Sequence, residues 1–244
     1  MIIGSGVQLS GGVQVISEIS IPYVTNGLVM NLLTAPSSGT TWTDATGNGN
    51  NATIITSGSG TATYTSNYGG GITLGTAINS EAICTAYNLG TAFTVEIWAQ
   101  PTAANYWATL WGNDIYSTKG YWAYWSSSAS GILAGSPTGN ILYSGITPNP
   151  GAIKHYVFTL TGSTFTTYLN GVAQTGSGSF ASPSGGVSTT GLNFGSRHPN
   201  NTGTANTPVD VCAGTYYQMR VYNRALSSSE VTQNFNGSRG IFGV

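Results

Sequence analysis

The sequence predicts an all-β fold: one antiparallel two-sheet β-sandwich with an extended N-terminal arm and one short C-terminal helix. From Gly27 onward, runs rich in Val, Ile, Thr, Tyr, Phe and Trp recur between clusters of Gly, Asn, Ser and Pro. Helical periodicity is almost absent, and 244 residues that are 40% apolar and 11% aromatic suffice for one large core. We therefore divide the chain into an arm over residues 1–25 and a sandwich over residues 26–244.

The charge content predicts a neutral, polar surface. Only 5% of the residues are charged and the formal net charge is −1. Because phosphate backbones and anionic lipids are bound through clustered Lys and Arg, we expect neither a nucleic-acid partner nor membrane insertion. The first residues also show neither a basic segment nor an apolar stretch of the kind found in signal peptides.

The arm contains a short near-repeat, 6–9 followed by 12–15. Each copy alternates apolar and polar residues, so Val7, Leu9, Val13 and Val15 are candidate attachment residues. An extended segment of this kind cannot bury both faces alone. It either pairs with the sandwich edge or another subunit by strand addition, or forms an ordinary first strand of the domain.

The clearest strand covers 93–100 and is stopped by Pro101. Its alternation places Phe93, Val95 and Ile97 on one face and Glu96 with Trp98 on the other. Glu96 is therefore expected to pair with Arg220 or Arg224 from the closing strand.

A second unit runs over 155–169, and Asn170-Gly171 then predicts a type I′ hairpin turn. After a final strand over 216–224, the residue pattern changes from that of a strand to that of a helix. Ser227 as N-cap and Glu230 three residues later predict a capping box, with Leu226 and Val231 as a hydrophobic staple. Val231 and Phe235 should face the sandwich, and 236–237 should stop the helix.

Four segments in this order resemble the LamG-like jelly rolls of the concanavalin A-like lectin and glucanase superfamily. They are 27–30 leading to 41–51, then 93–101, then 155–171 with its Tyr-Leu-Asn-Gly hairpin, and 221–227 with the capped turn. The resemblance implies a jelly roll over about residues 27–236. It says little about function, because this fold serves lectins, enzymes, adhesion modules and virion proteins alike.

Some relatives of this kind bind calcium, for which Asp44 is a weak candidate ligand. One carboxylate is few for a cation that takes six to eight oxygens. We favour a structural role, in which Asp44 accepts N–H groups of a tight loop rich in Gly and Asn, and expect neither a metal nor another cofactor. Cys84 and Cys212 are expected to be free thiols rather than one long-range disulfide.

The sequence shows no recognisable catalytic machinery. None of its acidic residues lies two or four positions from another along a strand, the spacing that would set two carboxyls on one face. These residues are Glu18, Asp44, Glu81, Glu96, Asp114, Asp210 and Glu230. The chain also contains no nucleophile elbow, zinc-protease helix or phosphate-binding loop motif, so we expect no enzyme activity.

Aromatic residues gather in the segment 106–125, interleaved with Asn and Asp. Flat rings beside amides suit sugar recognition, since apolar C–H faces stack on rings and hydroxyls take hydrogen bonds. At least half of this cluster should be sandwich core, because a strand sends alternate residues inward and outward. The candidate glycan-binding residues, including one histidine in a polar loop, are Trp107, Trp111, Asn113, Asp114, Tyr121, Trp125 and His198.

These features lead to two main hypotheses. The first is a non-enzymatic virion surface protein, such as a phage head decoration, fibre or tail component, whose arm holds it to other virion proteins or to copies of itself and whose sandwich contacts host glycans. The second is a secreted or cell-surface carbohydrate-binding module or lectin. A glycan-cleaving enzyme of the same superfamily is the least supported alternative.

Overall fold

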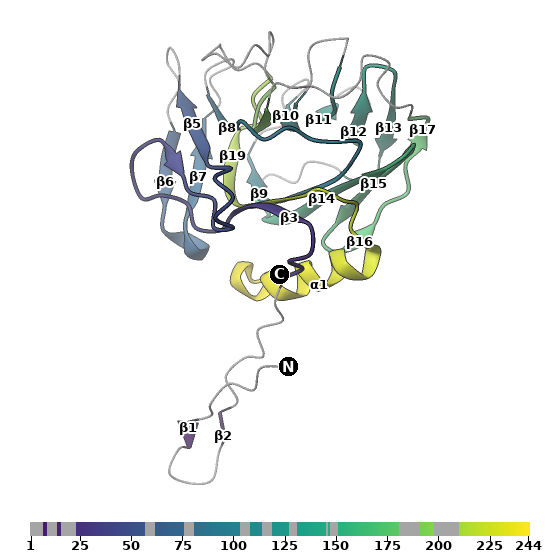
Figure 1. Ribbon diagram of the computed structural model, residues 1–244. Helices are drawn as coiled ribbons and strands as arrows, with labels where there is room; N and C mark the ends of the chain where they lie inside the picture. The colour runs from purple at the N-terminus through teal and green to yellow at the C-terminus, as the bar shows by residue number, and fades with distance from the viewer. Residues whose placement is uncertain are drawn as a thin grey trace.

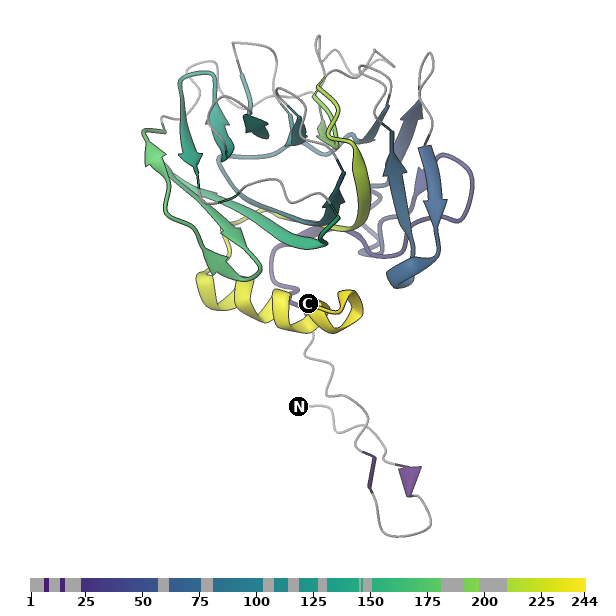
Figure 2. The same ribbon diagram turned by 180° about the vertical axis from the view of Figure 1, so that it is seen from behind.

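The computed structural model describes residues 7–8, 14–15, 23–56, 62–75, 81–102, 108–113, 119–126, 131–144, 146, 151–180, 191–197 and 210–244. Two antiparallel sheets stack on one another and one helix lies against the outside of one of them (Figures 1 and 2). The predicted all-β sandwich with one C-terminal helix is confirmed.

The first sheet has nine strands. Their order across the sheet is β17 (Ser177–Gly178), β13 (Gly139–Tyr143), β12 (Gly131–Ser136), β11 (Trp122–Ser126), β10 (Thr109–Gly112), β18 (Leu192–Phe194), β8 (Glu81–Thr85), β5 (Ala52–Thr56) and β4 (Thr41–Trp42).

The second sheet has eight strands. Their order is β16 (Val172–Ala173), β15 (Thr164–Leu169), β14 (Lys154–Thr161), β9 (Ala92–Pro101), β19 (Gly214–Tyr222), β7 (Gly71–Leu74) and β6 (Ala62–Thr65), while β3 (Leu28–Leu32) also pairs with β19. A short 3-10 helix, η1 (Asn67–Gly69), precedes β7.

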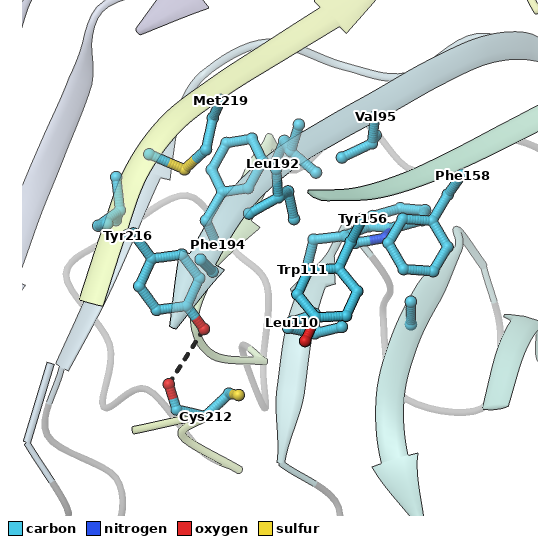
Figure 3. Packing of buried hydrophobic residues seen from close by; sticks show 14 of the residues in the cluster. Val95, Leu110, Trp111, Tyr156, Phe158, Leu192, Phe194, Cys212, Tyr216 and Met219 are labelled. Carbon is cyan, nitrogen blue, oxygen red and sulfur yellow. Dashed lines mark hydrogen bonds between the residues drawn. The ribbon is translucent and has the colours of Figure 1, made fainter. Parts of the chain in front are cut away.

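The core fills the space between the sheets. Phe93, Val95 and Ile97 point into it from β9, as the alternation predicted, and meet large rings from both sheets. Figure 3 shows Val95 near Trp111 and Phe158 in this cluster. Because almost every side chain here is apolar, the packing is the main source of the sandwich's stability.

Some polar groups that enter the core donate hydrogen bonds to the backbone. The Tyr216 hydroxyl donates to the backbone oxygen of Cys212 at 3.0 Å, the contact dashed in Figure 3. Cys84 and Cys212 are free thiols, as expected. Burial raises the pKa of Cys212 to about 11, so this thiol stays protonated at neutral pH.

The predicted hairpin after β15 is present. Asn170 and Gly171 have positive φ angles of 49° and 79°, as a type I′ turn requires. Gly171 also lies against Phe235, and a Cβ at this position would approach that ring to 3.0 Å. Glycine therefore serves both the turn and the contact between turn and helix.

Helix α1 (Ser228–Phe242) begins as the sequence predicted. The Ser227 hydroxyl accepts the N–H of Glu230, and the Glu230 carboxylate accepts the N–H of Ser227, which completes the capping box. The Arg224 guanidinium also donates to both carboxylate oxygens of Glu230. These contacts lower the pKa of Glu230 to about 2.

The predicted stop at 236–237 is wrong, because α1 continues to Phe242 and ends at Gly243, whose φ is 69°. Ser238 and Phe242 extend the buried face of the helix by two turns. Phe242 stacks on Trp98 with ring centroids 4.2 Å apart, and this contact outweighs the weak helix preference of Asn236 and Gly237. Among the described residues, no helix has the length and apolar character needed to cross a membrane.

The arm forms a pair of its own. Strands β1 (Val7–Gln8) and β2 (Gln14–Val15) are antiparallel, with Val7 opposite Val15, and they lie in a separate two-stranded sheet. Two residues of the first copy of the near-repeat therefore pair with two residues of the second within the chain. The candidate residues Leu9 and Val13 lie outside the described residues.

Candidate functional site

The aromatic segment of the nine-stranded sheet divides between its two faces. On β11, Ala123 and Trp125 point into the core, so Trp122 and Tyr124 lie on the opposite, outer face. Neither of these two residues belongs to a core cluster of the described residues.

Three of the candidate glycan-binding residues are core residues in the structure. Trp111 and Tyr121 are 0% exposed and Trp125 is 1% exposed, and all three pack in the main cluster. Figure 3 shows Trp111 enclosed by Tyr156, Phe158 and Leu110. A ring without an exposed face offers no surface for stacking on a sugar, so these residues stabilise the sandwich and a glycan site requires others.

Asn113 is also buried and has a structural role. Its side-chain oxygen accepts the N–H of Tyr121 at 2.9 Å, and its own N–H donates to the Tyr121 carbonyl oxygen at 3.0 Å. The residue therefore closes the connection between β10 and β11. The remaining candidates, Trp107, Asp114 and His198, lie outside the described residues.

The outer pair, Trp122 and Tyr124, comes from the same aromatic segment but was not among the candidate glycan-binding residues. The two rings are stacked with centroids 6.5 Å apart and an interplanar angle of 24°. The Arg197 guanidinium carbon lies 5.7 Å from the centroid of the Trp122 ring, within the range of a cation–π contact. Trp122 is 8% and Tyr124 6% exposed, so solvent reaches only a small part of each ring.

Glycines stand opposite the Trp122 indole on the outer face. Gly112 on β10 and Gly135 on β12 are its cross-strand partners, so no side chain flanks the ring at either position. Its Nε1–H is buried and has no hydrogen-bond partner, a feature that it shares with Trp42, Trp98 and Trp111. The ring therefore packs mainly against protein rather than solvent.

Arg197 is accompanied by one acidic residue. Its Nη1 lies 3.9 Å from Oδ2 of Asp210, a residue whose φ of 55° places it in the left-handed region. Burial raises the pKa of the Asp210 carboxyl, and the nearby Arg197 only partly offsets this shift. The cation over the Trp122 ring therefore has an anion beside it.

A row of side chains leads from the outer pair across three further strands. Tyr124 lies opposite Leu133 on β12, Leu133 opposite Leu142 on β13, and Leu142 opposite Ser177 on β17. We call Trp122, Tyr124, Leu133, Leu142 and Ser177 the outer strip.

At its far end the outer strip opens into a shallow cleft between β13, β16 and β17. The volume of this cleft is about 550 Å³. Its lining combines apolar side chains with hydroxyls and one amide: Leu142, Ser144, Val172, Ala173, Gln174, Thr175, Gly176 and Ser177.

The Asp44 loop is structural in the described residues. One carboxylate oxygen accepts the N–H groups of Asn31 and Thr46, and the other accepts the Thr46 hydroxyl and the N–H of Asn50. Burial alone would raise the pKa of Asp44, but these four donors lower it below its ordinary value. Within the described residues, no group of three His, Cys, Asp or Glu side chains could hold a metal ion.

Glu96 and His155 form part of a buried cluster beneath α1. The Glu96 carboxylate accepts from Arg220 at 2.6 Å and from the Asn234 amide at 2.6 Å, while His155 Nε2 lies 3.1 Å away. The predicted pairing of Glu96 with Arg220 is confirmed, and Arg224 pairs with Glu230 instead. Glu96, Arg220, His155 and Asn234 are all buried among protein groups, so the cluster attaches the helix to the sheet.

The comparisons with known proteins agree with this fold. A family model described as the concanavalin A-like lectin/glucanases superfamily matches residues 77–232. This match covers more than half of the chain, and the chain belongs to that superfamily. No curated protein sequence matches the chain.

Similar solved structures share the fold at low identity. One is domain 4 of the GH43 extracellular arabinanase AbnA from Geobacillus stearothermophilus, in complex with arabinotriose, with a TM-score of 0.57, 18% identity, and coverage of 86% of this chain and 98% of that domain. Another is the binding domain of Paraclostridial Mosquitocidal Protein 1, with a TM-score of 0.61, 17% identity, and coverage of 86% and 52%.

A third is the Trypanosoma rangeli sialidase, with a TM-score of 0.62, 16% identity, and coverage of 96% of this chain. The chain spans 35% of the length of that sialidase and 52% of the mosquitocidal binding domain. At these identities the likeness establishes the fold alone.

Proposed function

We propose that this chain is a non-enzymatic carbohydrate-binding module that contacts sugar through the outer strip. The observation that carries the proposal is the cleft at the far end of the outer strip, where Leu142 lies beside the Ser177 hydroxyl and the Gln174 amide. A sugar presents apolar C–H faces to rings and hydroxyl groups to hydrogen-bonding atoms. The outer strip offers both kinds of contact in one place.

The similar structures support binding as the role of this fold here. Domain 4 of the arabinanase was solved with arabinotriose, and the mosquitocidal protein contributes a domain named for binding. For the present chain this is an argument by likeness of fold, and the residues of the outer strip supply the chemical argument.

The acidic residues support a role without catalysis. Each of the four carboxylates whose side chains the structure describes is engaged in a structural contact. Asp44 accepts loop N–H groups, Glu96 pairs with Arg220, Asp210 lies beside Arg197, and Glu230 caps α1. Glycoside hydrolysis needs two carboxyls on either side of one bond, and these four serve four different parts of the fold.

A glycan array followed by titration calorimetry tests this function. We expect Leu142→Gln to weaken binding by about tenfold, since it replaces the apolar side chain of the cleft. Thr53→Gln is the matched control, because Thr53 is exposed on the outer face of the same sheet, on β5. Equal affinity of the wild type and Leu142→Gln for every glycan bound would refute the assignment.

A virion-surface role remains a second hypothesis, and one structural observation favours it. Strands β1 and β2 form a two-stranded sheet outside both sheets of the sandwich. A two-stranded hairpin is marginally stable alone, which favours a partner such as another virion protein or a second copy of this chain. Under this hypothesis the module lies on the surface of a particle, and under the main proposal it lies outside a cell.

Light scattering after size exclusion distinguishes the two. The full chain is compared with a chain that starts at Tyr23, which keeps the contacts of Tyr23 and Val24 with the sandwich. An assembly formed by the full chain and lost in the shorter chain would support the arm as an attachment device. Monomers in both cases would remove the structural support for the virion role.

A further inference from the structure

We propose that helix α1 and the base of the N-terminal arm, residues 23–27, form one latch that opens as a unit while the two sheets stay folded. Opening of the latch uncovers the outer face of the eight-stranded sheet, which α1 covers in Figures 1 and 2. The inference is independent of sugar binding, because it comes from the hydrogen bonds that join the arm base to the helix.

Asn234 is the joint between the helix and the arm base. Its side-chain oxygen accepts the N–H of Val24 at 2.8 Å, and its amide donates to the Tyr222 hydroxyl at 2.9 Å. The Tyr222 hydroxyl in turn donates to the Val24 carbonyl oxygen at 3.1 Å. Both backbone polar groups of Val24, which is buried, therefore belong to one network with a side chain of α1.

Glu96 fixes the direction of the Asn234 amide. The Glu96 carboxylate accepts from this amide at 2.6 Å, and an ionised carboxylate can only accept. The NH2 group of Asn234 must therefore face Glu96, which turns its oxygen toward Val24. When α1 leaves, the Val24 N–H loses its acceptor, and a buried donor without a partner favours release of the arm base into water.

A second contact joins the same parts at the start of the helix. Arg224 donates to the Asn26 carbonyl oxygen at 3.0 Å and to the two carboxylate oxygens of Glu230 at 2.6 and 2.9 Å. Glu230 and Asn234 are about one helical turn apart. The arm base is therefore connected to α1 at two neighbouring places.

The latch is separate from the main core. No residue of α1, all of which the structure describes, belongs to the cluster between the sheets. Val231 packs with Val24 in one small cluster, and Phe242 packs with Trp98 in another. A helix that is held by two small clusters and contains Gly237 should open at a lower free energy than the sandwich unfolds.

The surface under the latch favours opening further. Glu96 and Arg220 lie there at 1% exposure each. Burying an ion pair carries a desolvation penalty, and water removes part of that penalty when the helix leaves. An apolar surface in the same place would gain nothing from contact with water.

The coupling acts in both directions. A partner that draws residues 23–27 away from the sandwich also releases α1, and release of α1 frees the arm base. The latch thus relays an event at the arm to the surface around Trp98 and Glu96.

Native-state hydrogen exchange of the full chain, read by mass spectrometry, tests the latch. We expect peptides from α1 and peptides over 23–28 to have similar protection factors. Both should be at least about tenfold below those of peptides from β9 and β14, because the latch opens without the sheets.

A change at the far end of the helix tests the coupling. Phe242 contacts Trp98, Tyr217 and Tyr68 and lies about two turns from Asn234. Phe242→Ala should speed exchange of α1 and of 23–28 by the same factor, at least about tenfold. Ile241→Ala is the matched control, because Ile241 is 47% exposed, and it should leave both segments at wild-type rates.

Two results would overturn the inference. If α1 in the wild type exchanges no faster than β9 and β14, the helix does not open separately from the sheets. If Phe242→Ala speeds exchange of α1 but leaves 23–28 unchanged, the helix and the arm base open independently and there is no latch.

Discussion

Glu96 is a carboxylate at 1% exposure whose charge is met by three groups from different elements. Arg220 comes from β19, His155 from β14 and Asn234 from α1. Burial alone would raise the pKa of Glu96, but Arg220 and the other two groups hold it well below its ordinary value. The alternation on β9 predicted an ion pair with Arg220 or Arg224 without choosing between them, and nothing in the sequence indicated Asn234, because that contact depends on where the helix docks.

Substituting Glu96 by Gln should destabilise the fold by about 3 kcal/mol, because the change leaves Arg220 buried without its counter-charge. Urea unfolding at neutral pH measures this. Glu230→Gln is the control, since Glu230 is 28% exposed and its loss should cost about 1 kcal/mol, the typical value of a helix cap.

The same residue gives a pH dependence whose sign follows from its pKa. The folded pKa of Glu96 lies below the unfolded value, so its stabilisation is complete above the ordinary glutamate pKa and declines as pH falls toward the folded pKa. The stability difference between wild type and Glu96→Gln should therefore shrink in acid, as unfolding curves between neutral pH and the acid limit of the fold would show. A difference that does not change with pH would contradict this account of the cluster.

Asp44 leads to a prediction about calcium. Both of its oxygens already accept hydrogen bonds from the protein, so added calcium should leave the melting temperature unchanged. Asp44→Ala should lower the unfolding free energy by about 1–3 kcal/mol, because buried N–H groups lose their acceptor. A calcium-dependent rise in melting temperature that Asp44→Ala abolishes would show that the loop binds the ion.

At the scale of elements, local signals predicted starts and turns better than ends. The capping box at Ser227 and the turn at Asn170-Gly171 depend on residues a few positions apart, and both were predicted. The end of α1 depends on Phe242 meeting Trp98, two residues 144 positions apart in the sequence. No local pattern carries that information.

The far end of α1 can be tested directly. Phe242→Ala should cost about 3 kcal/mol, because it removes a buried ring that stacks on Trp98 and contacts Tyr217. Ile241→Ala is the control, since Ile241 is 47% exposed and its loss should cost little. Equal stabilities of the two variants in urea unfolding would mean that the last turns of the helix do not stabilise the sandwich.

Strand β11 shows why the candidate site was only partly predictable. The alternation separates Trp125 from Trp122 and Tyr124, but both sets are aromatic, so the pattern does not say which set faces inward. The neighbouring strands decide this. Gly112 and Gly135 stand beside Trp122, while Ala134 and Ala123 lie in the core beside Trp125. Trp125 is therefore a candidate from the sequence whose side chain lies in the core.

At the scale of the whole molecule, the first and last parts of the sandwich pair and hydrogen-bond with each other. β3 pairs with β19, and the N–H of Val24 donates to the Asn234 side chain at 2.8 Å, across 210 positions in the sequence. The class of fold follows from composition and alternation. This closure and the order of strands depend on distant pairings that no single segment specifies.

Such distant pairings should make folding slow. The entropy cost of closing long loops must be met before the stabilising distant contacts form, so we expect refolding from urea to take milliseconds to seconds. Stopped-flow tryptophan fluorescence measures this rate. The rate should not depend on protein concentration, because the closing contacts are within one chain. Refolding in microseconds would indicate that local contacts dominate the transition state.

The position of α1 also has a consequence for how the sandwich can be displayed. The helix covers the eight-stranded sheet, and both limits of the described sandwich lie on that side: Tyr23 sits under the Arg220 guanidinium, and Val244 follows the helix cap (Figures 1 and 2). A domain or protein joined at Tyr23 or at Val244 would lie on the helix side of the sandwich. The outer face of the nine-stranded sheet, with its outer strip, would then point away from that attachment point and be exposed to other molecules.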